Sequence, residues 1–169
     1  MIIWINGSFG TGKTTIAEIL KKKLTNAHIY DPEQVGYFLW DNFPPEMKQK
    51  GDFQDIEIWR SINYAVIQHL YHTFDGYIII PMTLVNKQYY DEIIGRLKQD
   101  GAVLRHFILT ASKKNIVERL LRRGEQSHSW AEQQIDRCLT AFQNEIPGIQ
   151  IDTDSLDAES AAKTILEML

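Results

Sequence analysis

Apolar runs and helical stripes alternate along the whole chain. Apolar residues at spacings of three and four predict amphipathic helices near residues 13–24, 86–99, 113–123, 129–142 and 158–169. Five short apolar runs predict buried strands, at residues 2–5, 27–31, 77–81, 103–109 and 149–152. Strands that alternate with helices predict an α/β domain in which helices cover both faces of a parallel sheet.

The connection after the second strand is much longer than an ordinary helical crossover. About 44 residues, 32–75, carry no strand pattern, and Pro44-Pro45 interrupts them before a helix predicted over residues 55–71. The segment is rich in aromatic side chains, namely Tyr37, Phe38, Trp40, Phe43, Phe53, Trp59 and Tyr64. Because ligands of parallel α/β sheets bind at the carboxyl ends of the strands, we predict that residues 32–75 form an acceptor-binding insertion.

The stretch GSFGTGKT at residues 7–14 matches the pattern G-x-x-x-x-G-K-[ST] of a phosphate-binding loop. It follows an apolar strand and opens an amphipathic helix, which is the context that this loop requires; the alternative is a plain glycine-rich turn. Glycines let the backbone N–H groups turn toward phosphate, and the helix N-terminus adds positive potential. The predicted nucleotide contacts are Gly7, Ser8, Phe9, Gly10, Thr11, Gly12, Lys13, Thr14 and Thr15.

Two side chains of this loop have specific predicted roles. Lys13 should reach the β- and γ-phosphates of ATP, and the Thr14 hydroxyl should bind Mg²⁺. At the end of the fifth strand, Asp152 and Thr153 are predicted near an adenine base, although capping of the next helix is an equal alternative.

The carboxylate that often completes the Mg²⁺ shell is missing after the third strand, which ends in the stretch IPMT at residues 80–83. Asp31, after the second strand, is the best substitute, and Glu33 follows two residues later. Asp31 is predicted either to bind Mg²⁺ through water or to take a proton from an acceptor hydroxyl. The alternative is that Asp31-Pro32 only caps the next helix.

Arginines lie on both sides of a polar stretch, GEQSHS at residues 124–129: Arg119, Arg122 and Arg123 before it and Arg137 after it. This pattern predicts a lid over residues 119–137 that closes on the triphosphate, because guanidinium groups suit phosphate oxygens. We expect Arg119, Arg123 and Arg137 to contact phosphate. Arg122 is expected to be a solvated residue that complements the helix dipole.

The acceptor pocket is predicted between the phosphate loop and the insertion, with Asp31 at its floor. Its other predicted lining residues are Glu33, Trp40, Phe43, Trp59 and Arg60. Arg60 would be the cation nearest to a polar group of the acceptor. Aromatic walls favour a flat apolar ligand, but the same side chains could instead pack the insertion onto the sheet.

Composition narrows the classes of partner. The net charge of −4 argues against a broadly basic nucleic-acid surface. No apolar stretch approaches the ~18 residues that span a bilayer, so no stable membrane insertion is expected. The only cysteine, Cys138, cannot form an internal disulfide, which favours a cytoplasmic location. With 169 residues the chain should form one domain, and its oligomeric state stays open.

Several stretches together resemble the TmrB-type tunicamycin-resistance ATP-binding proteins, over residues 1 to about 153. They are MIIWINGSFGTGKTT, YDPEQVG, IIIPMTLV, EIIGRLKQDG and SWAEQQIDRC. More widely, the chain is similar to small phosphate-loop kinases such as shikimate, gluconate and nucleoside monophosphate kinases. The resemblance implies a five-stranded parallel sheet of order 2-3-1-4-5, ATP binding through residues 7–15, and an acidic substrate-side residue at Asp31.

Two functions of different classes follow as expectations. The first is an ATP- and Mg²⁺-dependent phosphotransferase that acts on a nucleoside-type antibiotic or a related small molecule. The second is an ATP-dependent protein that binds and sequesters such an antibiotic without modifying it.

Overall fold

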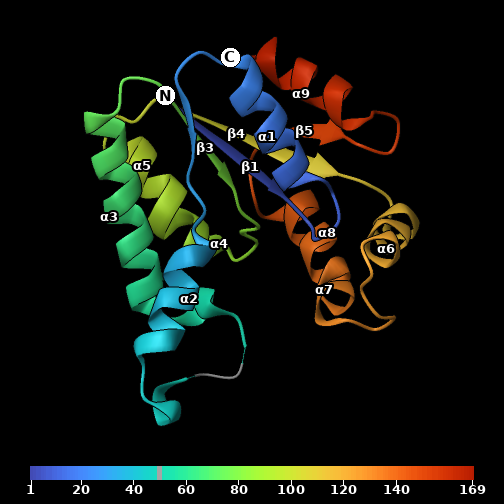
Figure 1. Cartoon of the computed structure of the whole chain (residues 1–169), viewed down its shortest axis with the longest axis horizontal. Helices are drawn as coiled ribbons and strands as arrows, with labels where there is room; N and C mark the ends of the chain where they lie inside the picture. Colours follow the sequence, from blue (N-terminus) through green and yellow to red (C-terminus); the bar gives the residue numbers. More distant parts are fainter. Residues whose placement is uncertain (49–50) are drawn as a thin grey trace.

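The computed structural model describes residues 1–48 and 51–169 and has a single five-stranded sheet at its centre (Figure 1). The strands are β1 (Ile2–Gly7), β2 (Ala27–Ile29), β3 (Tyr77–Pro81), β4 (Leu104–Thr110) and β5 (Ile149–Asp152). They are all parallel, in the order β2-β3-β1-β4-β5. The predicted strands, their direction and their order are therefore confirmed.

Helices cover both faces of this sheet, because the central strands are apolar on each side. On one face, Ile3 and Ile5 of β1 pack in a cluster with α1 (Lys13–Lys23) and α9 (Ala158–Leu166), which lie together in Figure 1. On the other face, Ile2 and Trp4 pack in a larger cluster with α3 (Glu57–Thr73) and α8 (Ile135–Asn144). Buried parallel strands of this kind read as continuous apolar runs in the sequence.

The long connection from β2 to β3 folds largely as helix. Its elements are α2 (Glu33–Asn42), the short 3₁₀ turns η1 (Pro45–Met47) and η2 (Phe53–Asp55), and α3. The predicted helix over residues 86–99 is present as α4 (Lys87–Tyr90), a π-helical segment η3 (Asp91–Gly95) and α5 (Arg96–Gln99).

The segment predicted as a lid begins in α6 (Lys113–Arg122) and continues through α7 (Trp130–Gln133) into α8. Ser129 caps α7, since its Oγ accepts a hydrogen bond from the Glu132 N–H at 3.3 Å. Figure 1 shows α2, α6 and α7 at the end of the molecule toward which β1 points. Within the described residues, no helix combines the length and the apolar character needed to cross a bilayer.

Candidate functional site

The loop after β1 takes a backbone path that glycine makes possible. Gly7 has φ 147°, and a Cβ there would lie 2.7 Å from Thr11 Oγ1 and 2.8 Å from the Leu109 carbonyl oxygen. Gly12 directly precedes α1 and has φ 94°, a backbone conformation that residues with a side chain rarely adopt. The loop therefore turns tightly and delivers the chain into the first turn of α1.

Lys13 folds back over this loop. Its Nζ donates to the carbonyl oxygens of Gly7 at 3.0 Å and Ser8 at 2.9 Å. Desolvation by the surrounding protein lowers the pKa of Lys13 to about 8, and the nearby Arg123 charge also lowers it. An anion beside the ammonium would offset both effects, so the position suits a negatively charged group.

The loop offers further donors that fit phosphate oxygens. The first turn of α1 has N–H groups without intrahelical partners, and no side chain caps it. These groups, together with Lys13, form a cradle of hydrogen-bond donors at the carboxyl end of the central strand.

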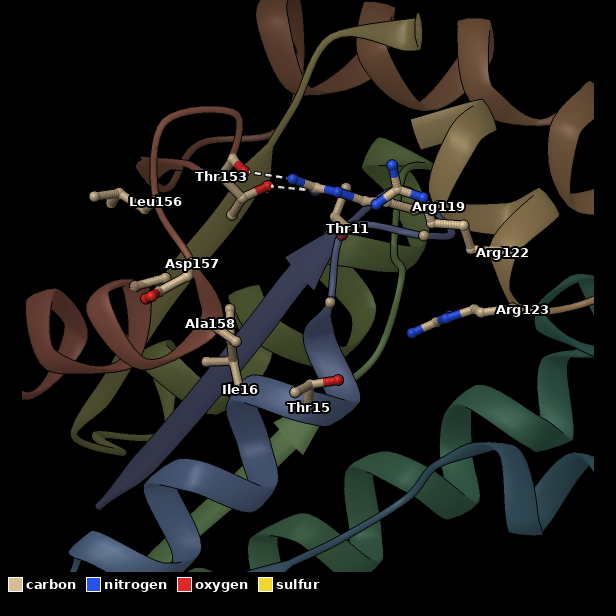
Figure 2. A pocket seen from close by; sticks show the side chains of 13 residues that line it. Thr11, Thr15, Ile16, Arg119, Arg122, Arg123, Thr153, Leu156, Asp157 and Ala158 are labelled. Carbon is tan, nitrogen blue, oxygen red and sulfur yellow. Dashed lines mark hydrogen bonds between the residues drawn. The ribbon is translucent and has the colours of Figure 1, made fainter. Parts of the chain in front are cut away.

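A first cavity, of about 370 Å³, lies between α6, the loop and the start of α9; we call it the α6–α9 cavity. In Figure 2 the Arg119 side chain crosses it from α6 to the loop after β5. Its Nη1 donates to Thr153 Oγ1 at 3.0 Å, and its Nη2 donates to the Thr153 carbonyl oxygen. Arg122, Arg123 and Thr15 also line this cavity.

The residues at the end of β5 divide between the two alternatives that the sequence left open. Thr153 is buried and lines the α6–α9 cavity. Asp152 is exposed and does not line it; its carboxylate accepts from the Asp154 N–H at 2.8 Å and the Ser155 hydroxyl at 3.1 Å. The contacts of Asp152 favour the second alternative, in which it stabilises the turn before α9.

A second cavity, of about 490 Å³, contains the predicted chemistry; we call it the loop cavity. Its lining residues are Phe9, Gly10, Gly12, Lys13, Thr14, Glu18, Lys21, Ile29, Asp31, Glu33, Pro81, Thr83, Leu120, Arg123 and Glu125. The loop lysine, the threonine predicted to bind Mg²⁺ and the two acids after β2 thus face one space. Within residues 1–48 and 51–169, no group of three His, Cys, Asp or Glu side chains is arranged to hold a metal ion.

Asp31 lines this cavity and also caps α2. Its Oδ1 accepts from the Glu33 N–H at 3.0 Å, and its Oδ2 accepts from Gln34 Nε2 at 3.1 Å. Asp31 can therefore both cap α2 and act in the cavity, since a carboxylate offers about four acceptor positions and these hydrogen bonds use two.

A third cavity, of about 400 Å³, adjoins the loop cavity and has mainly aromatic walls; we call it the aromatic cavity. It is lined by Phe9, Glu33, Tyr37, Trp40, Gly51, Asp52, Phe53, Gln54, Met82, Thr83 and Trp130. Phe9, Glu33 and Thr83 belong to both cavities, so the two spaces meet there. Burial, with the Asp31 charge, raises the pKa of Glu33, although Lys13 opposes this.

Three residues predicted to line the acceptor pocket lie elsewhere. Trp59 is fully buried in the core, where its Nε1 donates to the Pro32 carbonyl oxygen at 3.1 Å. Phe43 packs partly buried against the core and faces a separate hollow with Ile56. Arg60 is buried, pairs with Glu92, and donates to the Gln54 carbonyl oxygen at 2.7 Å. The sequence pattern was wrong for these three because it does not say which face of α3 meets the core, nor how the end of α2 packs against it.

Arg137 is also misplaced by the sequence-based prediction. It is exposed on α8, donates to Gln134 Oε1 at 3.3 Å, and lines a hollow with Asp55 and Asp136 rather than the loop cavity. Arg122, expected to be solvated, forms a surface pair with Glu118 at 3.8 Å and also reaches the edge of the α6–α9 cavity.

Sequence reasoning missed several lining residues. Thr83 is buried, and its hydroxyl donates to the Gly7 carbonyl oxygen at 2.8 Å, which ties β3 to the loop. Tyr37, Asp52 and Trp130 line the aromatic cavity from α2, η2 and α7. Two signals were visible in the sequence: the position of Thr83 just after β3, and the place of Tyr37 among the aromatic residues of the insertion.

Comparison with known proteins supports this description. Residues 3–137 match a family model described as AAA domain. The structure is similar to that of the tunicamycin resistance protein of Deinococcus radiodurans, with a TM-score of 0.81 and 26% sequence identity over 99% of this chain and 94% of that chain. No curated protein sequence matches the chain.

Two kinases are similar in fold. A gluconokinase from Sinorhizobium meliloti 1021 has a TM-score of 0.63 at 16% identity, over 98% of this chain and 93% of that one. A shikimate kinase from Bacteroides thetaiotaomicron has a TM-score of 0.64 at 16% identity, over 99% and 97%. The fold is thus that of the phosphate-loop, nucleotide-kinase-like proteins, and the predicted resemblance is confirmed.

Proposed function

Since the chain belongs to the AAA domain family, we propose that it is an ATP-dependent phosphotransferase that acts on a small molecule. The observation that carries this proposal is the meeting of two spaces. A cavity lined by Lys13 and the phosphate-binding loop shares Phe9, Glu33 and Thr83 with an adjoining aromatic cavity of about 400 Å³. A donor phosphate and a bound small molecule could therefore approach each other.

The residues of the loop fit a nucleoside triphosphate. Lys13 and the N–H groups at the start of α1 would hold the β- and γ-phosphates, and the Thr14 hydroxyl would bind Mg²⁺. The α6–α9 cavity, with Thr153 and Arg119, would receive the nucleoside end. When bound, MgATP would supply a phosphoryl group for transfer to a hydroxyl.

Asp31 and Arg123 would act on the acceptor side and on the developing charge. Both line the loop cavity. Asp31 would orient an acceptor hydroxyl and take its proton, and the Arg123 guanidinium would stabilise negative charge on phosphate oxygens. Trp40 and Glu33 would bind the body of the acceptor from the aromatic cavity.

A nucleoside-type antibiotic, or a related metabolite, is the acceptor we propose. The support is the similarity to a tunicamycin resistance protein together with the aromatic cavity. The single cysteine agrees with a cytoplasmic location for such an activity.

A second function has its own support. The loop directly after β3 carries no carboxylate, and the Asp31 carboxylate already accepts one hydrogen bond from the Glu33 N–H at the start of α2 and one from the Gln34 side chain. A protein that binds ATP and an antibiotic but lacks an effective base would sequester the drug without phosphorylating it.

Mass spectrometry separates these two functions. The protein would be incubated with MgATP and tunicamycin, and the drug would be weighed afterwards, with Lys13→Ala as the matched control. A gain of one phosphoryl group, lost in the control, supports the transferase; unchanged mass despite measurable binding supports sequestration.

Asp31→Asn tests the assigned base in the same assay. The substitution keeps the shape and the acceptor oxygen that caps α2, but removes the charge. We expect ATP affinity to be retained and any transfer to slow at least about tenfold. An equal rate would reduce Asp31 to a helix cap.

A further inference from the structure

We propose that the aromatic cavity takes a ligand that carries a protonated amine on a flat apolar body. This inference rests on the proposed function and names the chemical class of its acceptor. It is carried by the polar groups that line the cavity among aromatic walls, because two of them are carboxylates and a third is a buried amide oxygen without a partner among the described residues.

Two carboxylates line the cavity from different elements. Glu33 lies at the start of α2, and Asp52 lies just before η2. Neither forms an ion pair among the described residues; Glu33 Oε2 accepts only from the Tyr37 hydroxyl at 3.4 Å, and Asp52 Oδ1 accepts from the Gln54 N–H at 3.0 Å. Both retain free acceptor positions.

Gln54 adds an independent acceptor. It is 5% exposed and lines the same cavity. Its Nε2 donates to the Thr83 carbonyl oxygen at 2.9 Å, which fixes the orientation of the amide. Its Oε1 is buried and has no partner among the described residues, and a buried acceptor of this kind is costly until a donor reaches it.

The described part of the chain brings no lysine or arginine to the wall of this cavity. Arg60, the cation predicted there, is engaged by Glu92 and by the Gln54 carbonyl oxygen. The Thr83 hydroxyl already donates its hydrogen bond to the Gly7 carbonyl oxygen. An anionic ligand would therefore meet two carboxylates, with the charges of Lys13 and Arg137 acting on them only from outside the described cavity wall, whereas an ammonium offers donors and no acceptor.

The aromatic walls suit the same ligand. Trp40 lies edge to face with Phe53 and with Tyr37, at centroid distances of 5.3 Å and 6.4 Å, and Trp130 lies edge to face with Phe9 at 5.1 Å. Aromatic faces attract cations and stack on flat apolar groups. Burial also raises the pKa values of Glu33 and Asp52, and an ammonium beside them would favour their charged forms.

Three matched probes test the charge of the ligand. They are 2-(2-naphthyl)ethylamine, 3-(2-naphthyl)propanamide and 3-(2-naphthyl)propanoate, which share an aromatic body and differ in charge. Binding to the ¹⁵N-labelled protein without nucleotide would be followed by NMR. We expect the amine to bind at least about tenfold more tightly than the amide, and the carboxylate to bind most weakly.

The NMR signals also report the place of binding. The indole N–H signals of Trp40 and Trp130 should shift more than that of Trp4, which is fully buried in the core. Glu33→Gln and Asp52→Asn should each reduce the amine-to-amide affinity ratio toward one. Asp41→Asn, an exposed acid of α2 that does not line the cavity, should leave the ratio unchanged.

Several outcomes would overturn the inference: a carboxylate that binds as well as the amine, no detectable binding of the amine, a ratio unchanged in both cavity variants, or shifts remote from Trp40 and Trp130. Calorimetric titration of the same sample with MgATP keeps the two proposals apart. ATP binding without an amine preference rejects only this inference, whereas an amine preference without ATP binding rejects only the transferase.

Discussion

The phosphate-binding loop and the long insertion after β2 bound the same pair of cavities, but the chain specifies them in different ways. In the loop the backbone decides, because Gly7 and Gly12 take conformations that other residues disfavour. In the insertion, the packing of the side chains determines which residues line the cavity. Trp40 and Trp59 lie in the same segment of the sequence, yet one lines a cavity and the other is fully buried.

The contacts of the two tryptophans explain why one is core and the other lines a cavity. Trp59 is held by the Pro32 carbonyl oxygen and packs against Phe53 at a centroid distance of 5.4 Å, so it joins α2 to α3. Trp40 also packs against Phe53, at a centroid distance of 5.3 Å, but it lines the aromatic cavity. A binding loop can therefore be recognised from its motif, whereas a binding wall depends on how two helices pack.

The largest expected effect separates these two tryptophans. Trp59→Ala should lower the free energy of unfolding by about 3 to 5 kcal/mol, because it empties a core site and removes the hydrogen bond from the indole to the Pro32 carbonyl oxygen. Trp40→Ala should cost much less stability but should weaken binding of an aromatic ligand. Urea denaturation followed by circular dichroism, together with ligand titration, measures both quantities.

If both variants lose stability to the same extent and Trp40→Ala binds the ligand normally, the aromatic cavity is only a packing defect of the insertion. The contrast between the two tryptophans would then fail.

The next effect concerns the loop. Lys13→Ala should weaken ATP binding by roughly a hundredfold, since it removes the lysine side chain that folds over the loop and leaves phosphate charge without a partner in a partly buried site. The fold should persist, because Lys13 is only partly buried and bonds loop carbonyls. Calorimetric titration of a folded variant checks this, and affinity equal to the wild type would reject the phosphate-loop reading.

A smaller effect should distinguish two arginines of the predicted lid. Arg119→Ala should reduce ATP affinity by about tenfold, because Arg119 spans the α6–α9 cavity to Thr153. Arg137→Ala should leave the affinity nearly unchanged, because Arg137 faces a different hollow. The pair is well matched, since both residues are arginines of the segment 119–137. An equal loss of ATP affinity in both variants would instead support the lid predicted from the sequence, with both arginines at the triphosphate.

The sequence was sufficient for the elements that obey a local rule. Apolar runs located all five strands, and the motif at residues 7–14 located the loop at the carboxyl end of β1. It was insufficient where long-range packing chooses. Arg60 followed a tryptophan on an amphipathic helix and looked free, but Glu92, 32 residues away in the chain, pairs with it. No local pattern contains that contact.

Asp52 illustrates the same limit from the other side. It lies outside any helix or long strand, just before the short turn η2, and nothing in its neighbours marks it as a cavity residue. Its place in the cavity wall depends on how the insertion packs in three dimensions, which the local sequence does not show. Trp130 likewise reaches the cavity from α7, far along the chain.

The smallest expected effect uses pH to compare two acids. Burial raises the pKa of Glu33 above its usual value, helped by Asp31 and Asp52 and opposed by Lys13 and the Tyr37 hydroxyl. The folded state then binds a proton more readily than the unfolded state, so this group makes the free energy of unfolding fall as pH rises through that window. Glu33→Gln should therefore be more stable than the wild type at pH 7, and the difference should shrink toward pH 4.5.

Glu92 is the opposite case and serves as the control. Burial alone would raise its pKa, but hydrogen bonds from Arg60 and Gln88 lower it overall. Its stabilising contribution is present at pH 7 and is lost as pH falls through the lowered pKa, so Glu92→Gln should cost most stability at neutral pH. Denaturation of both variants and the wild type from pH 7 to about pH 3 gives two differences that should change in opposite directions, that of Glu33→Gln mainly above about pH 4.5 and that of Glu92→Gln mainly below it. If the Glu33→Gln difference instead grew as pH fell, the carboxylate would be stabilised as the anion in the empty cavity, and its affinity for a cationic ligand would need another source.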